Sequence, residues 1–380
     1  MTPPRLIVAD ENIPQVREWF APLGTVVTRP GRSLTAADVR AADILLVRSV
    51  TPVGSELVAG SRVAFVGTAT IGTDHLDLDY LASAGIAVAS APASNAQSVV
   101  DYVLGVFAAL DGVLEQLLAG GTVGVVGLGN VGARLLRRLR AMGVDAVGYD
   151  PFVDNADLPQ QSLAEVLSRD VICLNTPLTR AGEHPTFHLV NEKNLATLKP
   201  DAVLLNAGRG PVIDNRALLK LLERRSDVRV VLDVWETEPA IDTELLQKVA
   251  LGTPHIAGYS LDGKLAGTRM LLRACCDFLG EKIPPLQLSD EPLHLHLSKG
   301  EAVATLRAAL LAVYDPRRDD VALRHFSDAP EMATHFDGLR KNYPVRREIA
   351  SVVIENWSAL DHVTQKLLQA AGFKEQIKIA

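Results

Sequence analysis

The stretch GTVGVVGLGNVGARLLRRLRAMGVDAVGYD, residues 121–150, constrains the fold more than any other part of the sequence. Its apolar start predicts a buried strand, its glycines a tight turn, the spacing of its leucines a helix, and its apolar end a second strand. Strands that alternate with helices predict a parallel, doubly wound sheet. The stretch therefore predicts an α/β domain.

The glycines of the turn have the spacing of a loop that binds a pyrophosphate. Gly127, Gly129 and Gly132 fit G-x-G-x-x-G, with Asn130 and Val131 between the last two. In order, the glycines allow the tight turn, the close approach of the backbone to phosphate, and the packing of helix on strand. The N–H groups at the start of the helix attract the anion.

Asp150 ends the strand that follows this helix, where a dinucleotide-binding unit carries an acidic residue. Its carboxylate can accept hydrogen bonds from both ribose hydroxyls, and it would repel a 2′-phosphate. The unit therefore predicts NAD rather than NADP as the cofactor. The alternative is a glycine turn that binds no ligand.

The chain of 380 residues is too long for one ordinary domain. Before the glycine loop, continuous apolar runs that alternate with helix candidates predict a first doubly wound sheet. After it, three further runs, each preceded by a helix, extend the second sheet. The predicted strands besides the two in the glycine unit are 5–10, 42–48, 63–69, 86–91, 170–177, 202–208 and 228–235.

Two other segments complete the predicted organisation. Residues 95–118 are expected to form one long helix that leads into the glycine unit. From about residue 281 the pattern of strands and helices changes. A proline-bearing linker precedes an alternating LHLHL run, and two helices and a strand are predicted after it. The sequence thus predicts a flavodoxin-like domain, a Rossmann domain and a small C-terminal α+β module.

Composition excludes several classes of function. The net charge of −7 and the absence of a basic stripe argue against nucleic acid as the main partner. Cys173, Cys275 and Cys276 have neither disulfide nor zinc spacing, and no metal constellation is evident. The N-terminus does not read as a signal peptide and no apolar stretch is long enough to span a bilayer. We therefore expect a cytoplasmic protein without a metal.

Three residues with complementary chemistry follow successive strand ends, where ligands bind in open α/β sheets. Arg209 can hold a carboxylate through two parallel hydrogen bonds, and His255 can accept the proton of a C2 hydroxyl group while hydride leaves C2. Glu238 can orient the imidazole and raise its pKa. Glu236 is the rival carboxylate, but Pro239 favours an extended conformation of Glu238.

The run VGLGNVG…YDP…NAGRGPVID…LDVWETEP…TPHIAG resembles the D-isomer-specific 2-hydroxyacid dehydrogenases over most of residues 1–280. The resemblance implies that Arg209, Glu238 and His255 are the catalytic trio, since Glu238 rather than Glu236 matches the family position. It also implies a discontinuous substrate domain, 1–93 with 254–280, an inserted NAD domain, 94–253, and a C-terminal dimerisation module, 281–380. Positions that usually touch NAD correspond to Thr176, Ala207, Gly208, Arg209, Asp233 and Gly258, although Thr176 and Asp233 could equally be structural caps.

Other stretches, DENIP, VRSVT and GTATIGTDHLD, with Tyr259 and the C-terminal module, resemble one branch of this family. That branch oxidises 4-phospho-D-erythronate to 2-oxo-3-hydroxy-4-phosphobutanoate in pyridoxal 5′-phosphate biosynthesis, and it is homodimeric. The alternatives are oxidation of 3-phosphoglycerate or another D-2-hydroxy acid, and an NAD-responsive corepressor that does no chemistry. The candidate substrate ligands are Ser49, Thr70, Tyr259 and Arg48.

Each of these candidates has an ordinary alternative. Ser49 and Thr70 could cap the helices that follow them, and Arg48 could be a solvated surface charge. The basic cluster Arg340, Lys341, Arg346 and Arg347 reads as a solvated face. The sharper hypothesis is that Arg346 and Arg347 lend a charge to the phosphate pocket of a partner subunit.

Overall fold

The computed structural model describes residues 4–286, 292–325 and 331–375. Its contacts divide the chain into two compact units. Unit 1 comprises Met1–Asn95 and Ser260–Glu291, and unit 2 comprises Ala96–Tyr259 and Pro292–Ala380. Each unit is built on one large parallel sheet covered by helices, as the alternation of strands and helices predicts.

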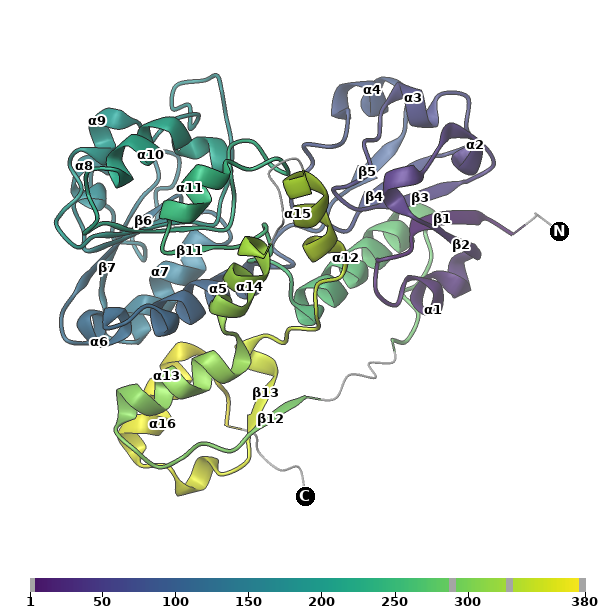
Figure 1. The fold of residues 1–380 in the computed structure, drawn as a ribbon. Coiled ribbons are helices and arrows are strands. Elements are labelled where there is room, and N and C mark those ends of the chain that lie inside the picture. Colours follow the sequence, from purple (N-terminus) through teal and green to yellow (C-terminus); the bar gives the residue numbers. More distant parts are fainter. Residues whose placement is uncertain (1–3, 287–291, 326–330, 376–380) are drawn as a thin grey trace. The chain divides into compact units, whose positions relative to one another are not determined.

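Unit 1 is built on a five-stranded parallel sheet of order β2-β1-β3-β4-β5, the flavodoxin-like order (Figure 1). Its strands are β1 Leu6–Asp10, β2 Thr25–Arg29, β3 Ile44–Val47, β4 Phe65–Thr68 and β5 Ala87–Ala89. The sequence analysis missed β2, because this edge strand is only half-buried and lacks the continuous apolar run of the others. The helices are α1 Val16–Phe20, α2 Ala36–Val39, α3 Ser55–Val58, α4 Leu78–Ser83 and α12 Leu261–Leu279.

Unit 2 is built on a six-stranded parallel sheet of order β11-β10-β9-β8-β6-β7. The direction of strand order reverses between β6 and β8, which makes the edge beyond these strands the expected ligand site. The strands are β6 Thr122–Val126, β7 Asp145–Tyr149, β8 Val171–Leu174, β9 Val203–Asn206, β10 Arg229–Leu232 and β11 Leu251–Gly252.

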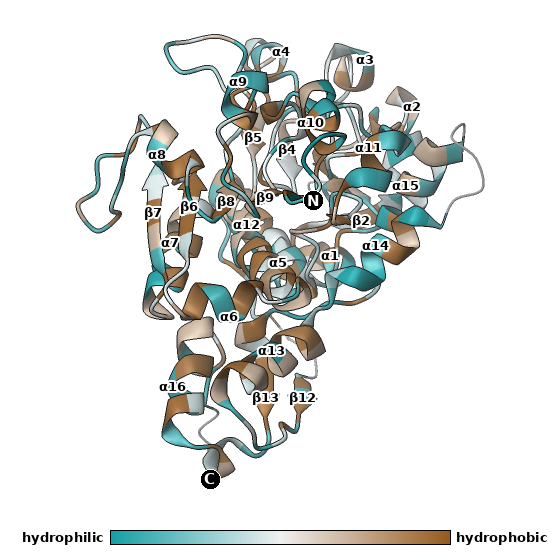
Figure 2. Ribbon diagram, turned by 60° about the vertical axis from the view of Figure 1, so that its left-hand side comes forward, coloured by the Kyte–Doolittle hydropathy of each residue, from teal (hydrophilic) through white to brown (hydrophobic). Residues whose placement is uncertain are grey.

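Helices cover both faces of this sheet, since alternate strand residues enter two different apolar clusters. The helices are α5 Ala96–Ala109, α6 Val113–Leu118, α7 Gly132–Ala141, α8 Leu163–Leu167, α9 Glu192–Leu195, α10 Asn215–Leu222 and α11 Thr243–Lys248. Val123 and Val125 pack in the apolar cluster that contains helices α5, α6 and α7. Val126 packs in the cluster on the other face, which contains helices α8, α9, α10 and α11. Figure 2 shows the hydrophobic residues along β6 and β8 that these helices bury.

The prediction of one helix over residues 95–118 is wrong. Helix α5 ends at Ala109 and α6 begins at Val113, and Gly112 between them has φ 75°. A glycine adopts this left-handed conformation at little cost, and the chain changes direction there. Because α5 is buried all round, its apolar pattern runs on into α6 and hides the break.

The C-terminal module belongs to unit 2 and contains a parallel pair of short strands, β12 Leu293–Leu295 and β13 Val352–Ile354. Helices α13 Ala302–Val313 and α16 His362–Ala371 pack with α5 and α7 in one apolar cluster. Two further helices, α14 Pro316–Arg324 and α15 Met332–Lys341, were not predicted, because their many charges obscure the apolar residues that they bury.

Helix α14 lies along the outer side of β11. The N–H of Gly252 donates a hydrogen bond to Asp320 Oδ1 at 2.7 Å, and Arg324 Nη2 donates to the Val249 carbonyl at 3.0 Å. These bonds satisfy backbone groups that an edge strand leaves open. The module is therefore anchored to the edge of the six-stranded sheet.

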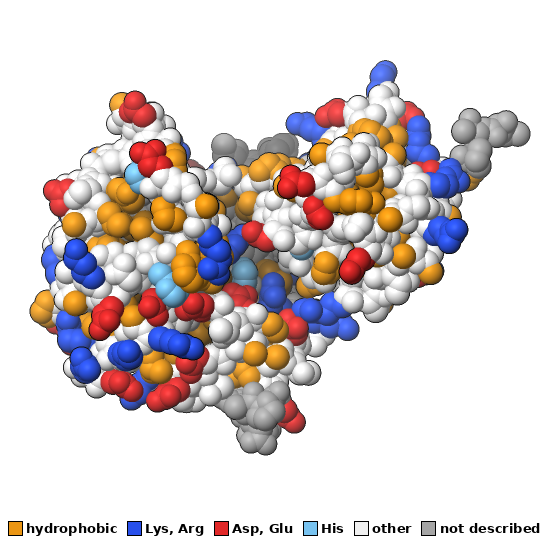
Figure 3. Space-filling model, turned by 90° about the horizontal axis from the view of Figure 1, so that it is seen from above, with side chains coloured by type: hydrophobic (Ala, Val, Ile, Leu, Met, Phe, Trp, Pro, Cys, Tyr) orange, Lys and Arg blue, Asp and Glu red, His pale blue; other side chains and the backbone are white. Residues whose placement is uncertain are grey.

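None of the described helices is long and apolar enough to cross a membrane. On the face in Figure 3, Lys and Arg side chains are interspersed with Asp and Glu side chains. The described part of this face thus carries no single-sign stripe of the kind that binds nucleic acid.

Asp101 of α5 is a buried carboxyl group that joins this helix to the C-terminal module. It accepts hydrogen bonds from Gln97 Nε2 at 2.7 Å and from the Ile349 N–H at 2.8 Å. Burial raises the pKa of Asp101 to about 7, and Glu348 adds to this rise, although the two hydrogen bonds and Arg138 oppose it. The folded protein therefore holds a proton that the unfolded chain has already released above its ordinary pKa.

We expect the Asp101→Asn variant to lose less stability than the native protein as the pH rises from 4 to 7. In the native protein, the free energy of unfolding falls through this window by about 1.4 kcal/mol per pH unit, and the fall levels off above about pH 7. An asparagine still accepts the Ile349 N–H and has no charge to bury. Unfolding midpoints at pH 5, 6, 7 and 8 measure the effect, with Asp111→Asn, at an exposed position between α5 and α6, as the control. Parallel curves for the native protein and Asp101→Asn would contradict the assignment.

Candidate active site

The parallel strands of unit 2 bring their carboxyl ends to one edge, and the predicted site residues of this unit follow those ends. The glycine loop follows β6, Thr176 follows β8, and Arg209 follows β9. Glu238 and His255 follow β10 and β11. The order of the strands thus assembles residues that are far apart in sequence.

The glycine loop has the geometry that a bound pyrophosphate requires. Gly127 has φ 87°, and a Cβ atom on Gly132 would lie 1.8 Å from the Gly127 carbonyl oxygen. A Cβ atom on Gly129 would meet nothing within 4 Å, so the space over the loop is open. The residues therefore fit a dinucleotide, whose phosphates would lie on the N–H groups at the start of α7.

The segment after β8 supports the same conclusion. The side-chain amide of Asn175 and the hydroxyl group of Thr176 are buried without a hydrogen-bond partner. A Cβ atom on Gly127 or on Gly208 would come within about 3 Å of this segment, so all three loops are in contact. Unsatisfied buried polar atoms beside a glycine loop indicate a ligand that completes them.

Asp150 lies at the end of β7 and reaches across to the glycine loop. Its Oδ2 accepts a hydrogen bond from the Leu128 N–H at 2.8 Å, and its Oδ1 accepts one from the Phe152 N–H at 3.0 Å. Each carboxylate oxygen retains a further lone pair, so these bonds leave room for a ribose. Its contact with ribose hydroxyls stays a prediction.

Asp233 holds the loop after β11 through hydrogen bonds, which agrees with the structural alternative given for it above. It is buried, and its carboxylate accepts hydrogen bonds from the Ile256 and Ala257 N–H groups and from Thr253 Oγ1, at 2.7–3.0 Å. These bonds shape the loop after β11. The Asp233 carbonyl also accepts the N–H of His255, at 2.7 Å.

His255 is held in an uncommon backbone conformation, with φ 56°. Its Nδ1 lies 2.7 Å from Oε2 of Glu238, and both side chains are partly exposed. The pair leaves Nε2, on the opposite side of the ring, for a ligand. Backbone strain of this kind persists only where surrounding bonds fix it, as the bonds to Asp233 do here.

Glu238 is the carboxylate that contacts His255. Its Oε1 accepts a hydrogen bond from the Trp235 N–H at 3.1 Å. Burial works to raise the pKa of Glu238, but the charge and hydrogen bond of His255, helped by the Trp235 N–H, hold it below its usual range. The carboxylate is therefore ionised opposite the imidazole at neutral pH.

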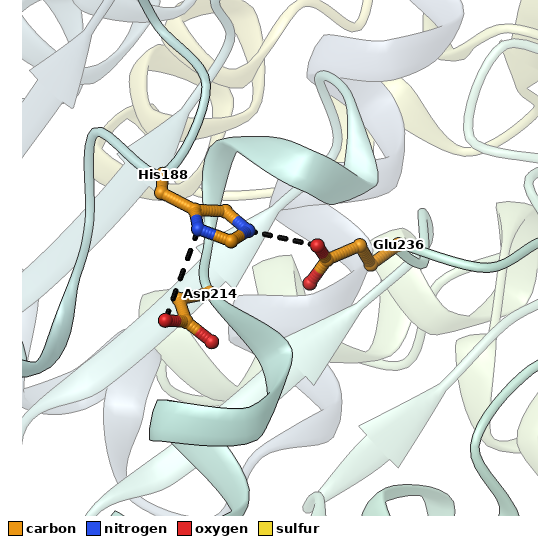
Figure 4. A group of neighbouring side chains, drawn as sticks. All are labelled: His188, Asp214 and Glu236. Carbon is orange, nitrogen blue, oxygen red and sulfur yellow. Dashed lines mark hydrogen bonds and ion pairs between the residues drawn. The ribbon is translucent and has the colours of Figure 1, made fainter.

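Glu236, the rival carboxylate, has different partners (Figure 4). Its Oε1 lies 2.7 Å from Nε2 of His188, and its Oε2 accepts the Asn215 N–H. Asp214 lies 3.8 Å from Nδ1 of His188 and caps α10. The three side chains are the one group in the described residues that could hold a metal ion. Their atoms are already engaged with one another and with backbone N–H groups, so we interpret the group as a hydrogen-bonded brace.

The loop that carries Arg209 contacts the loop that leads to Glu238 because a glycine follows Arg209. A Cβ atom on Gly210 would lie 1.9 Å from the Trp235 carbonyl oxygen, so only glycine lets the two loops touch. Trp235 is buried and its Nε1 donates to the Thr253 carbonyl at 3.0 Å. The sequence analysis missed Gly210 and Trp235, which together join the loops that carry Arg209, Glu238 and His255.

The C-terminal module also contacts the loop after β11. Arg346 is buried, with its Nη2 donating to the Ala257 and Ser98 carbonyls and its guanidinium group over the ring of Tyr314. The hypothesis that Arg346 serves a partner subunit is therefore wrong, because its own chain encloses it. Tyr259 contacts the module as well, with its ring edge-to-face against Tyr343.

The remaining substrate candidates lie in unit 1. Ser49 is exposed after β3, and the Thr70 hydroxyl lies 2.7 Å from that of Thr68 and donates to Gly72. Neither caps a helix, since Gly54 and Asp77 occupy the N-cap positions of α3 and α4. Arg48 is not a solvated charge, because its Nε lies 3.3 Å from buried Asp10. Their contacts with substrate stay predictions.

Comparison with known proteins bears on both units. Residues 91–257 match the family described as D-isomer specific 2-hydroxyacid dehydrogenase, NAD binding domain, and residues 291–372 match a domain of unknown function, DUF3410. The structure is similar to a D-lactate dehydrogenase from Aquifex aeolicus complexed with NAD and lactic acid. The TM-score is 0.61 at 24% identity, and the match covers 73% of this chain and 96% of the other. That likeness concerns the fold.

The similarity to sequence relatives extends over nearly the whole length of this chain and of each relative. The erythronate-4-phosphate dehydrogenase of Cellvibrio japonicus is 49% identical, over 97% of this chain and 99% of its own. That of Pseudomonas putida strain W619 is 52% identical, over 92% of this chain and 94% of its own. Such matches include the C-terminal module as well as the nucleotide-binding sheet.

Residues 91–257, which contain the six-stranded sheet, the glycine loop and the histidine–carboxylate pair, match the NAD binding domain of the class of D-isomer specific 2-hydroxyacid dehydrogenases. Within this class, the sequence identity of 49–52% over nearly the whole chain decides which family it belongs to. The chain belongs to the family of the erythronate-4-phosphate dehydrogenases.

Proposed function

We propose that this protein oxidises 4-phospho-D-erythronate at C2 to 2-oxo-3-hydroxy-4-phosphobutanoate, with NAD as the cofactor. The observation that carries the proposal is the 2.7 Å contact of His255 Nδ1 with Glu238, beside a loop built for a dinucleotide. Relatives named erythronate-4-phosphate dehydrogenase support the choice of substrate. The name also supports a place in pyridoxal 5′-phosphate biosynthesis.

Each residue of the trio has a distinct part in this reaction. Arg209 holds the C1 carboxylate, since a guanidinium group matches a carboxylate with two parallel hydrogen bonds. His255 accepts the proton of the C2 hydroxyl group at Nε2, because Nδ1 is engaged by Glu238. The ionised Glu238 keeps the ring oriented and stabilises the imidazolium form. NAD, when bound, supplies the acceptor for the hydride that leaves C2.

The residues that would hold NAD are those at the carboxyl edge of the six-stranded sheet. Asn130, Val131 and the loop glycines would hold the phosphates, and Asp150 would hold the ribose. The rest of this set is Thr176, Ala207, Gly208, Asp233 and Gly258.

The wider organisation is part of the proposal. We assign residues 1–93 with 254–280 to substrate binding, 94–253 to NAD binding, and 281–380 to a homodimer interface. Ser49, Thr70, Arg48 and Tyr259 are the substrate ligands. The free and buried state of the three cysteines agrees with action in the reducing cytoplasm.

A paired assay tests the substrate. The protein with NAD should form NADH with 4-phospho-D-erythronate and at least a hundred-fold more slowly with 3-phospho-D-glycerate, at about the specificity that a well-placed polar site achieves. Equal rates would favour a broader phospho-hydroxyacid dehydrogenase. Absence of NADH with a panel of 2-hydroxy acids would instead favour a binding protein that responds to NAD.

The Glu238→Gln variant tests the pairing with His255. We expect turnover to fall by part of the ~10²- to 10⁴-fold contribution of acid–base groups. The acidic limb of the pH profile of kcat/KM should move to lower pH, because a neutral amide no longer favours the imidazolium form. The matched control is Glu236→Gln, whose carboxylate contacts His188 instead and should leave the limb in place. An unmoved limb in Glu238→Gln would show that the pair does not act in catalysis.

A further inference from the structure

Arg340 is a cation of the C-terminal module that lies beside the candidate active site. It is on the last turn of α15, and its guanidinium carbon lies 5.8 Å from the ring centroid of Tyr259 and 6.0 Å from that of Phe336. Phe336 is fully buried and anchors α15 in an apolar cluster of the nucleotide-binding sheet. The arginine is thus held by packing against Tyr259, four residues after His255.

The guanidinium group is also within electrostatic reach of the catalytic pair. Burial works to raise the pKa of Glu238, and Arg340 helps His255 and the Trp235 N–H, whose effects are larger, to lower it. Burial works to lower the pKa of Arg340, but Tyr259 and Glu238, with Asp337, keep it above its usual value. The arginine therefore stays charged while mostly enclosed.

The bonds of this cation are incomplete. Its carboxylate partner on the same helix, Asp337, lies 4.0 Å from Nη1, at the limit for an ion pair. Its Nε is buried and has no hydrogen-bond partner. A buried donor of a charged group is costly to leave unpaired, so the group is suited to an anion that completes it.

The proposed substrate carries two anionic groups at opposite ends. Arg209 follows β9 and is assigned to the carboxylate next to the reacting carbon, so the distal phosphate needs another cation. Arginine suits phosphate because its fork of donors matches two oxygen atoms. Tyr259 follows His255 by four residues, and its side chain both lies under the Arg340 guanidinium group and forms a hydrogen bond with it, so the two side chains can act together on a bound anion.

We propose that Arg340 binds the distal phosphate of the substrate and, with Tyr259, sets the preference for a phosphorylated hydroxy acid. This inference rests on the proposed function and assigns a role in substrate recognition to the domain of unknown function. Arg340 belongs to the same chain as the trio it serves. The rival role is that of a positioning residue, acting only through Glu238.

Two variants in the full-length protein separate these roles. Arg340→Met keeps a long apolar stem against Phe336 and Tyr259 and removes the charge, and Arg340→Lys keeps the charge without the fork. We expect Arg340→Met to lower kcat/KM for 4-phospho-D-erythronate by about 10² or more, mainly through KM, as the loss of a charged hydrogen-bonded contact predicts. Arg340→Lys should recover part of this loss.

The comparison with unphosphorylated D-erythronate decides between recognition and positioning. If Arg340 binds phosphate, kcat/KM for D-erythronate stays within about two-fold in Arg340→Met, because this substrate never used the contact. Equal losses on both substrates, with a shifted pH profile, would overturn the proposal in favour of positioning. Arg318→Met, an exposed arginine on α14, is the control and should change neither value.

A second measurement keeps this inference apart from the proposed function. The dissociation constant of inorganic phosphate, measured by equilibrium dialysis on the protein with NAD, needs no turnover. We expect it to rise at least ten-fold in Arg340→Met and not in Arg318→Met. An unchanged constant would overturn the role of Arg340 even if 4-phospho-D-erythronate is the substrate. A raised constant with no turnover of that substrate would instead refute the proposed reaction alone.

Discussion

Replacing His255 with alanine should lower kcat by about 10² to 10⁴, with little change in the affinity for NAD. The imidazole is the group whose Nε2 is left open by the contact of Nδ1 with Glu238. The loss should fall on the chemical step, so a primary isotope effect with substrate deuterated at C2 should approach its intrinsic value. Stopped-flow measurement of NADH formation gives the rate.

The control for this variant is the same substitution at a histidine that lies away from the candidate active site. His362 is exposed at the start of α16, and His362→Ala should retain native kcat. The affinity for NAD, measured by fluorescence titration, distinguishes a damaged site from a missing base. A His255→Ala enzyme that keeps more than a tenth of native turnover would show that another group accepts the proton.

Replacing Arg209 with alanine should lower kcat/KM by about 10² to 10³, equivalent to roughly 3 to 4 kcal/mol. The loss should appear in both KM and kcat, because the carboxylate both binds there and is oriented there. Arg209→Lys keeps the charge but loses the planar fork, so it should recover only part of the rate.

The side chain of Arg209 is partly exposed and its loop is held by Gly210 against Trp235, so truncation should leave the fold intact. Thermal unfolding checks this point. Addition of free guanidinium ion should restore some activity to Arg209→Ala and none to His255→Ala. Full activity of Arg209→Ala would place the carboxylate elsewhere.

Most of the fold could be predicted because its signals are local. The strands of both sheets are continuous apolar runs, and the glycine loop carries its turn, its helix start and its acidic residue within 30 residues. Arg209, Glu238 and His255 could be assigned to one edge of the sheet because parallel strands end there, and their joint role in catalysis stays a prediction. The distinction between Glu238 and Glu236 came from a resemblance, and the structure now shows His255 beside the former and His188 beside the latter.

What could not be predicted depends on contacts between distant segments. Arg340 and Arg346 lie in one basic stretch of sequence, yet one lies over Tyr259 and the other is enclosed by backbone carbonyls. Charge alone cannot distinguish them. Helices α14 and α15 were not predicted because the residues they bury pack near the edge of a sheet formed more than 60 positions earlier, and such packing leaves no local period in the sequence.

The hydrogen bonds by which α14 covers the outer side of β11 limit how two copies of this chain can associate. An unprotected outer strand invites a second molecule to extend the sheet through its open backbone groups. Here Asp320 already occupies such a group at Gly252, and Arg324 donates to the carbonyl of Val249 just before the strand. A dimer that continues the sheet across this boundary would first have to detach α14. Any pairing of subunits must therefore use side-chain surfaces rather than shared strands at this end.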